Sequence, residues 1–140
     1  MKPVLYVDDD ENDAFFMCHA WELAQITHPL IHLKDGQAAM DYLDGQGRYS
    51  DRKQHPFPCL LLLDLKMPRK SGFDVLYWLR ERPALAALRV VVISGSDQSE
   101  DVARARDLGA IDYIVKTPVL KVLLEVLRNR KAVWFAPAAR

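Results

Sequence analysis

The sequence has few cysteines, no net charge and no long apolar run. Cys18 and Cys59 are too few for a disulfide scaffold, and their apolar neighbours are typical of small buried groups. Lys plus Arg and Asp plus Glu number 19 each, so the formal net charge is zero, which argues against a nucleic-acid module held by bulk charge. No stretch reaches the ~18 apolar residues of a membrane span, and the N-terminus lacks a signal-peptide pattern. We therefore expect a cytoplasmic protein with neither a nucleic-acid nor a membrane partner.

The hydrophobic residues, half of the 140, fit one compact domain with a substantial core. Five apolar runs alternate with five helical patterns, and the runs are 4–7, 30–33, 60–63, 90–93 and 111–115. This alternation predicts an α/β fold with a doubly wound, mainly parallel sheet and right-handed crossovers. For this number of strands we expect a flavodoxin-like (βα)5 domain with the strand order 2-1-3-4-5.

Asp64 is the most unusual charge in the chain, because it directly follows the four leucines of the run 60–63. Such a run is typical of a strand buried on both faces, where a charge is costly. At the carboxyl end of that strand the carboxylate would lie where open α/β folds bind ligands. We therefore expect Asp64 to take part in chemistry.

Polar side chains also follow three of the other predicted strands. Asp8 and Asp9 follow the first run, Ser94 the fourth and Lys116 the fifth. Because parallel strands present their carboxyl ends at one edge, these groups should face one crevice. Taken alone, the acids at 8–10 could instead be a solvated cluster at a helix start, with Asp10 or Asn12 as the cap.

The combination predicts phosphoryl chemistry. Three close carboxylates repel one another, and Mg²⁺ relieves this because it prefers oxygen ligands and is commonly held by carboxylates plus a phosphate. Lys116 would supply a positive charge, and the Ser94 hydroxyl would donate to a phosphoryl oxygen. Asp64 is then left as the nucleophile that forms an acyl phosphate.

The ordered set of Asp8-Asp9, Asp64 with Met67-Pro68 and Gly72, Ser94-Gly95 and Lys116 resembles the receiver domain of two-component response regulators. The resemblance covers about residues 3 to 131. It implies that Asp64 accepts phosphate from the phosphohistidine of a sensor histidine kinase, and that the domain catalyses its own phosphorylation without being an enzyme in the usual sense.

The resemblance also implies roles for the other site residues. Asp9, Asp64 and the backbone carbonyl of Lys66 would bind Mg²⁺ directly, and Asp8 would act through water. Ser94 and Tyr113 match the family's switch pair, in which phosphorylation draws the hydroxyl to the phosphoryl group and turns the aromatic ring inward.

Two departures from the family pattern narrow the resemblance. Most receivers have proline directly after the lysine, often with a cis bond, whereas here Thr117 intervenes before Pro118. A cis Lys116–Thr117 bond would cost on the order of 3 kcal/mol. The segment 45–58 is also longer than usual, and with the aromatic pair Trp134-Phe135 it resembles stand-alone regulators paired with bacterial phytochrome-type kinases.

We expect a receiver domain over 1–131 and a C-terminal tail with the aromatic pair over 132–140. The receiver leaves no room for an output domain, so output would pass through protein contacts or onward phosphotransfer. We also expect a homodimer through the face of the fourth helix, fifth strand and fifth helix, with help from Trp134-Phe135.

Three other functions compete with this one. The first is a receiver-like interaction module that works without phosphorylation, against which the complete set of site residues argues. The second is an aspartyl-phosphate hydrolase, which typically has an acid two residues after the nucleophile, where this chain has Lys66. The third is a flavin-binding flavodoxin, but no Ser/Thr/Gly-rich phosphate loop follows the first run.

Overall fold

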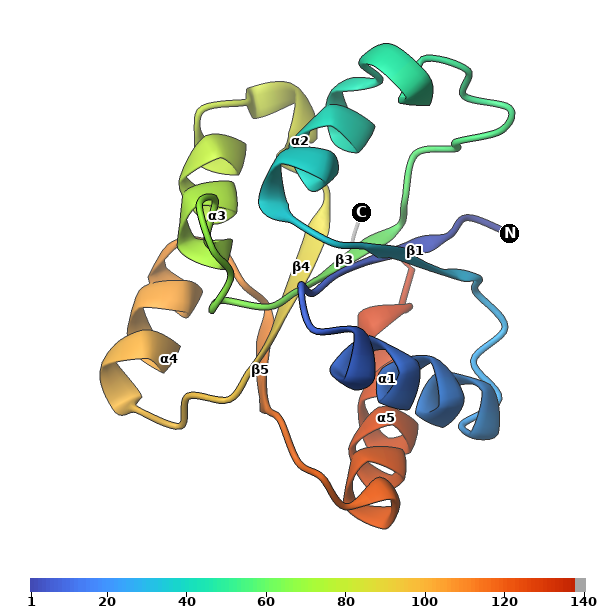
Figure 1. Cartoon of the computed structure of the whole chain (residues 1–140), viewed down its shortest axis with the longest axis vertical. Helices are drawn as coiled ribbons and strands as arrows, with labels where there is room; N and C mark the ends of the chain where they lie inside the picture. Colours follow the sequence, from blue (N-terminus) through green and yellow to red (C-terminus); the bar gives the residue numbers. More distant parts are fainter. Residues whose placement is uncertain (138–140) are drawn as a thin grey trace.

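The computed structural model describes residues 1–137 and contains one five-stranded parallel sheet in the order β2-β1-β3-β4-β5 (Figure 1). The strands are β1 (Val4–Val7), β2 (Leu30–Leu33), β3 (Leu60–Leu63), β4 (Arg89–Ser94) and β5 (Asp112–Val115). The helices are α1 (Glu11–Leu23), α2 (Gly36–Asp44), α3 (Gly72–Arg80), α4 (Ser99–Asp107) and α5 (Leu120–Trp134), with the short 3-10 helices η1 (Gly47–Tyr49) and η2 (Pro83–Leu85). The predicted fold class and strand order are confirmed.

The helices cover both faces of the sheet, as Figure 1 shows, with α1 and α5 on one face and α2, α3 and α4 on the other. Successive residues of a strand point to opposite faces, so Leu60 and Leu62 pack with α1 and α5 while Leu61 and Leu63 pack with the other layer. All four leucines of β3 are fully buried. Burial on both faces explains why the strands lack polar alternation.

Short polar side chains fix where the helices begin. Asp10 is the N-cap of α1, and its carboxylate accepts a hydrogen bond from the Asp13 backbone N–H at 2.9 Å. This decides between the two predicted caps, Asp10 and Asn12. Ser71 and Asp74 form a reciprocal capping box at the start of α3.

Helix α5 is longer than its apolar pattern suggests and runs three residues past the domain boundary expected at 131. The buried carboxylate of Asp112 accepts hydrogen bonds from Arg130, at 2.6 Å to Oδ2, and from the indole N–H of Trp134 at 3.0 Å. Arg89 in turn donates to the backbone carbonyl of Trp134 at 2.9 Å. These bonds join the last turn of α5 to β4 and β5, so Trp134 belongs to the packed domain. Residues 138–140 of the expected tail lie outside the described residues.

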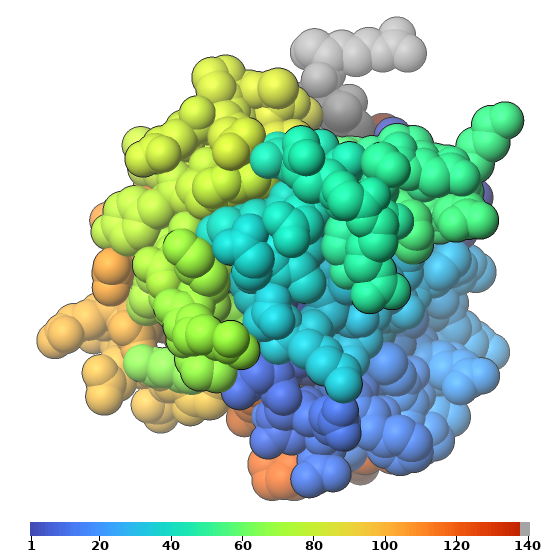
Figure 2. Space-filling model, turned by 45° about the horizontal axis from the view of Figure 1, so that its top comes forward, coloured from blue at the N-terminus to red at the C-terminus, as the bar shows by residue number. Residues whose placement is uncertain are grey.

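The long segment 45–58 is ordered by bonds to α2. Arg52 donates to the carbonyl oxygens of Tyr42 at 2.7 Å and Leu43 at 2.9 Å, which satisfies the last turn of the helix. Tyr42 donates to the carbonyl of Pro56 at 2.9 Å. In Figure 2 this segment and α2 form one continuous surface.

Gly72 lets α3 begin directly against the residue that follows β3. A Cβ at this position would lie 2.3 Å from the carbonyl oxygen of Asp64 and 2.7 Å from the Cα of Leu65. Both neighbours are backbone atoms, which cannot turn away as a side chain can. The glycine is therefore needed to set the backbone of Asp64.

We expect Gly72→Ala to lower the free energy of unfolding by about 1–3 kcal/mol, because the added methyl group must displace backbone. Urea denaturation measures the change. Gly95→Ala is the matched control, since a Cβ there meets no atom within 4 Å. Equal losses in the two variants would contradict this account of Gly72.

Replacing Asp112 by Asn tests the attachment of α5. We expect a loss of about 1–3 kcal/mol in the free energy of unfolding, because Arg130 loses a charged partner in a partly buried position. The exposed Glu125→Gln on the same helix is the control and should change stability little.

The effect of Asp112→Asn should also depend on pH. Burial alone would raise the pKa of Asp112, but the bonds from Arg130 and Trp134 lower it below the usual 3.8. A depressed folded-state pKa gives stability that is fully present above the unfolded value and is lost as pH falls through the folded value. The difference in free energy of unfolding between wild type and Asp112→Asn should therefore shrink below about pH 4. A difference that grows there would contradict a lowered pKa of Asp112.

Candidate functional site

The carboxyl ends of β1, β3, β4 and β5 meet at one edge of the sheet, as the sequence predicted. Backbone hydrogen bonds continue past the strands, from Asp64 N–H to the Val7 carbonyl at 3.0 Å and from Lys116 N–H to the Ser94 carbonyl at 2.7 Å. These bonds fix the backbone of each residue relative to the neighbouring strand. The side chains of Asp8, Asp64 and Lys116 consequently converge.

The ammonium of Lys116 contacts three carboxylates. Its Nζ lies 3.0 Å from Oδ2 of Asp8, 2.8 Å from Oδ2 of Asp13 and 3.4 Å from Oδ2 of Asp64. The Asp8 and Asp64 residues are buried, at 0% and 2% exposed. A buried carboxylate is tolerated only when it is paired or hydrogen-bonded, so Lys116 is a central counter-charge of the site.

Asp8 has further partners that hold it in place. The phenol of Tyr6 donates to Oδ2 of Asp8 at 2.6 Å, and the Asp10 backbone N–H donates to Oδ1 at 3.0 Å. Burial and the hydrogen bond to Asp8 both raise the pKa of Tyr6, so the phenol remains a proton donor. Asp8 is thereby fixed within the site, while Asp9 is exposed.

The surroundings of Asp64 and Lys116 shift the pKa values of both side chains. Burial raises the pKa of Asp64 to about 6, although the Lys116 ammonium opposes this rise and the Asp8 charge adds to it. Burial alone would lower the pKa of Lys116, but hydrogen bonds to Asp13 and Asp8 raise it above its usual value. Lys116 therefore stays charged. Further positive charge near Asp64 would stabilise the ionised form of its carboxyl group.

The three carboxylates of the predicted metal site form a cluster that suits a divalent cation. Within residues 1–137, Asp8, Asp9 and Asp64 each offer a carboxylate oxygen, and these oxygens lie within 4.8 Å of one another. An all-oxygen, multiply charged donor set fits a hard cation. The backbone N–H of Lys66 donates to Oδ1 of Asp64 at 3.3 Å, while the exposed Lys66 side chain lies 3.8 Å from Asp101.

Ser94 and Tyr113 are connected through the loop after β4. The hydroxyl oxygen of Ser94, which is fully buried, accepts a hydrogen bond from the Ser96 N–H at 3.2 Å. The phenol of Tyr113 donates to the Ser96 carbonyl at 2.8 Å, and Tyr113 is only 9% exposed. The aromatic ring is thus already buried, whereas the family resemblance suggested that it turns inward on phosphorylation.

The peptide bond between Lys116 and Thr117 is trans, as is every peptide bond in the described range. The Lys116 side chain therefore makes its contacts without a cis bond after it. The hydroxyl oxygen of Thr117 accepts a hydrogen bond from the Val119 N–H at 3.1 Å, just before α5 begins at Leu120. Thr117 thus orders the turn just before α5.

Asp13 is the site residue that sequence reasoning missed. It lies in the first turn of α1, three residues after the cap Asp10, and not at a strand end. Its hydrogen bond with Lys116 spans 103 positions of sequence. The sequence did contain an indication of this role. The first turn of a helix that begins soon after Asp8 lies near the same edge of the sheet, so an acid in that turn is close to the site.

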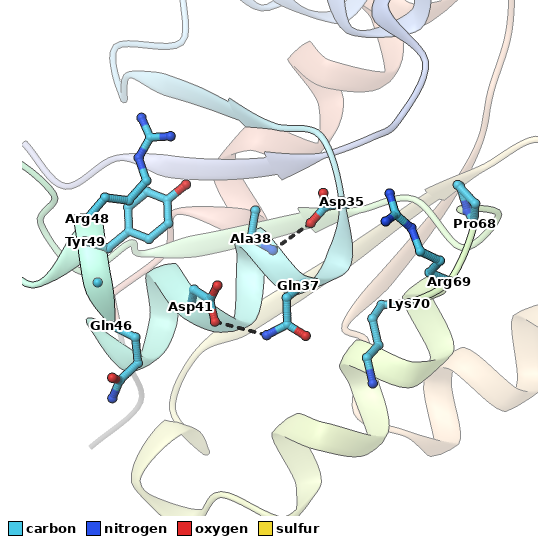
Figure 3. Close-up of a pocket in the computed structure, with 11 residues that line it drawn as sticks. Asp35, Gln37, Ala38, Asp41, Gln46, Arg48, Tyr49, Pro68, Arg69 and Lys70 are labelled. Atoms are coloured by element: carbon cyan, nitrogen blue, oxygen red, sulfur yellow. Dashed lines mark hydrogen bonds between the residues drawn. The ribbon is translucent and has the colours of Figure 1, made fainter.

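A groove of about 680 Å³ lies away from the carboxylate cluster, between α2, η1 and the loop after β3 (Figure 3). Arg48 and Tyr49 lie at one end of it and Arg69 and Lys70 at the other. None of the predicted site residues lines it. The volume of a groove therefore does not identify the candidate site in this protein. The convergence of charged side chains identifies it.

Comparison with known proteins identifies relatives along nearly the whole chain. Residues 4–128 match the family model described as the response regulator receiver domain. The chain is 35% identical over 133 residues to the response regulator Rcp1 of Synechocystis sp., covering 95% of this chain and 88% of that protein.

Solved structures agree with this match. The phosphorylated cyanobacterial phytochrome response regulator RcpA is 30% identical, with a TM-score of 0.85 and coverage of 99% of this chain and 96% of that one. The Mn²⁺-bound form of Rcp1 is 33% identical, with a TM-score of 0.83 and coverage of 99% and 98%. The chain belongs to the response regulator receiver domain family and is similar, over almost its full length, to single-domain phytochrome response regulators.

Proposed function

We propose that Asp64 is the residue at which this receiver domain accepts a phosphoryl group from the phosphohistidine of a sensor histidine kinase. The observation that carries the proposal is the pairing of the buried Asp64 carboxylate with Lys116 at the carboxyl edge of the sheet. An acid that served only the packing of the fold would need no exposed acidic neighbour. Asp64 has such a neighbour in Asp9. The output passes through protein contacts.

In the transfer, an oxygen of the Asp64 carboxylate attacks phosphorus while the P–N bond of the phosphohistidine breaks. The electron pair of that bond returns to the imidazole nitrogen. Lys116 neutralises negative charge on the phosphoryl oxygens, and the Ser94 hydroxyl donates to one of them. Positioning and charge neutralisation supply most of the catalysis, so the domain promotes its own phosphorylation without being a classical enzyme.

We propose Mg²⁺ as the metal, held directly by Asp9, Asp64 and the Lys66 carbonyl, with Asp8 acting through water. When bound, this ion supplies positive charge that offsets the repulsion between the carboxylates and the incoming phosphoryl group. The oxygen-only donor set supports a hard cation, and the related Rcp1 has been crystallised in a Mn²⁺-bound form.

The proposed switch pair is Ser94 and Tyr113. Movement of the Ser94 hydroxyl toward the phosphoryl group would break its bond with the Ser96 N–H, and the Ser96 carbonyl is also the acceptor for Tyr113. Since the ring is already buried, we assign the signal to this loop and not to an inward rotation of the ring.

The partners proposed are a histidine kinase of the phytochrome type and a second copy of the chain. Similarity to RcpA and Rcp1 supports the kinase class. For the dimer, the face of α4, β5 and α5 presents Ile111, Val115, Val119 and Val122, each 43–50% exposed. Trp134 is only 1% exposed and cannot contribute, and Phe135 stacks on His28 of its own chain with ring centroids 4.2 Å apart.

The division into a receiver over 1–131 and a tail from 132 remains a proposal, as does a cytoplasmic location. The packing of Trp134 favours a domain that extends through α5. Within residues 1–137 no helix has the length and apolar character to cross a membrane.

Acetyl phosphate with Mg²⁺ tests the acceptor. We expect the intact mass to increase by one phosphoryl group in the wild type and to stay unchanged in Asp64→Asn, because the attacking carboxylate is missing. Chelating the metal with EDTA should abolish the increase in the wild type, since the acidic cluster needs the ion. An unchanged wild-type mass, also with a phosphorylated phytochrome-type kinase as donor, would contradict the proposal.

Light scattering tests the dimer. The wild type carrying the phosphoryl mimic beryllofluoride should have the mass of two chains, and the double variant Val119→Lys with Val122→Lys should have the mass of one, because like charges would face each other. Phe15→Lys is the control, since Phe15 is 78% exposed on α1, a helix that is not part of the proposed face. A monomeric wild type with and without the mimic excludes this interface.

A further inference from the structure

The closest partner of Lys116 is an acid outside the metal cluster. The ammonium has three N–H donors and meets three carboxylates, and the contact with Asp13 at 2.8 Å is shorter than those with Asp8 at 3.0 Å and Asp64 at 3.4 Å. The proposed acceptor therefore has the longest of the three contacts.

Asp13 is held in position by α1. Its backbone N–H donates to the cap Asp10 at 2.9 Å, which fixes the turn that carries it. Its side chain is 46% exposed, whereas that of Asp64 is 3% exposed. Water can therefore solvate the Asp13 carboxylate when Lys116 moves away, so that the contact is reversible at small cost.

We propose that Asp13 is a positioning residue that holds the Lys116 ammonium back from Asp64. The inference rests on the proposed phosphorylation of Asp64. A phosphoryl group on Asp64 adds negative charge and acceptor oxygens next to Lys116, so it competes with Asp13 for the ammonium. The strength of the Asp13 contact then sets how readily the phosphorylated state forms.

Asp13→Asn removes the competing charge and keeps an oxygen that can accept a hydrogen bond. Exposed ion pairs contribute about 0.2–1 kcal/mol, which corresponds to an effect of up to about fivefold. With Mg²⁺ present, we expect the variant to bind beryllofluoride about two- to fivefold more tightly. The half-saturating concentration of acetyl phosphate should fall by a similar factor, while the maximal rate of phosphorylation changes less.

Two controls separate this role from a general change in charge. Glu11→Gln removes one negative charge from the same helical turn, but Glu11 pairs with Lys34 at 3.0 Å and not with Lys116. It should leave beryllofluoride binding close to the wild-type value. Asp13→Glu keeps the charge at a half-exposed position and should restore wild-type binding.

A double-mutant cycle with Lys116→Met tests whether Asp13 acts through the lysine. In the Lys116→Met background, Asp13→Asn should have no effect on beryllofluoride affinity. An equal tightening by Glu11→Gln, or an undiminished effect of Asp13→Asn without the lysine, would overturn the inference.

A crystal structure of Asp13→Asn without phosphate gives a measurement that does not depend on phosphorylation. We expect Nζ of Lys116 to move from 3.4 Å to within about 2.9 Å of the Asp64 carboxylate. If the wild type takes up no phosphoryl group, the proposed function fails while this shift still tests the Asp13 contact. An unmoved lysine overturns the inference even if phosphorylation is observed.

Discussion

The site depends on one ammonium, that of Lys116, meeting several carboxylates at once. Asp8 and Asp64 are buried at the end of a sheet whose central strand is all leucine, where unpaired charge would be costly. The strand order places β1 beside β3 and leaves β4 between β3 and β5, so the long lysine side chain must reach across. Its length and flexibility make the buried acids compatible with the fold.

Hydrogen bonds also connect this site to the loop after β4. The backbone of Lys116 is bonded to the Ser94 carbonyl, the Ser94 hydroxyl to the Ser96 N–H, and the Ser96 carbonyl to Tyr113 on β5. These three hydrogen bonds join the end of β4 and the loop after it to β5, so a displacement of Lys116 or Ser94 would disturb them. That loop leads into α4, so the same few hydrogen bonds lie between the carboxylate cluster and the face formed by α4, β5 and α5.

The strands and their order followed from sequence because buried parallel strands are continuous apolar runs, and the leucines 60–63 and valines 90–92 left little ambiguity. The end of α5 did not follow. It depends on Asp112, whose bonds to Arg130 and Trp134 form only after β5 and α5 pack together. Asp13 escaped prediction for a related reason, since reasoning from strand ends passes over an acid that reaches the site from a helix.

The residue after the lysine shows how the same position can be held by different means. Receivers usually place proline there, and this chain has Thr117 in a trans bond. Lys116 is instead fixed at both ends: its N–H is bonded to Ser94, and its ammonium is shared among three acids. The Thr117 hydroxyl orders the next turn by accepting from Val119. When the backbone restraint of proline is absent, the position of the ammonium depends more on its carboxylate partners, and Asp13 is the nearest of them.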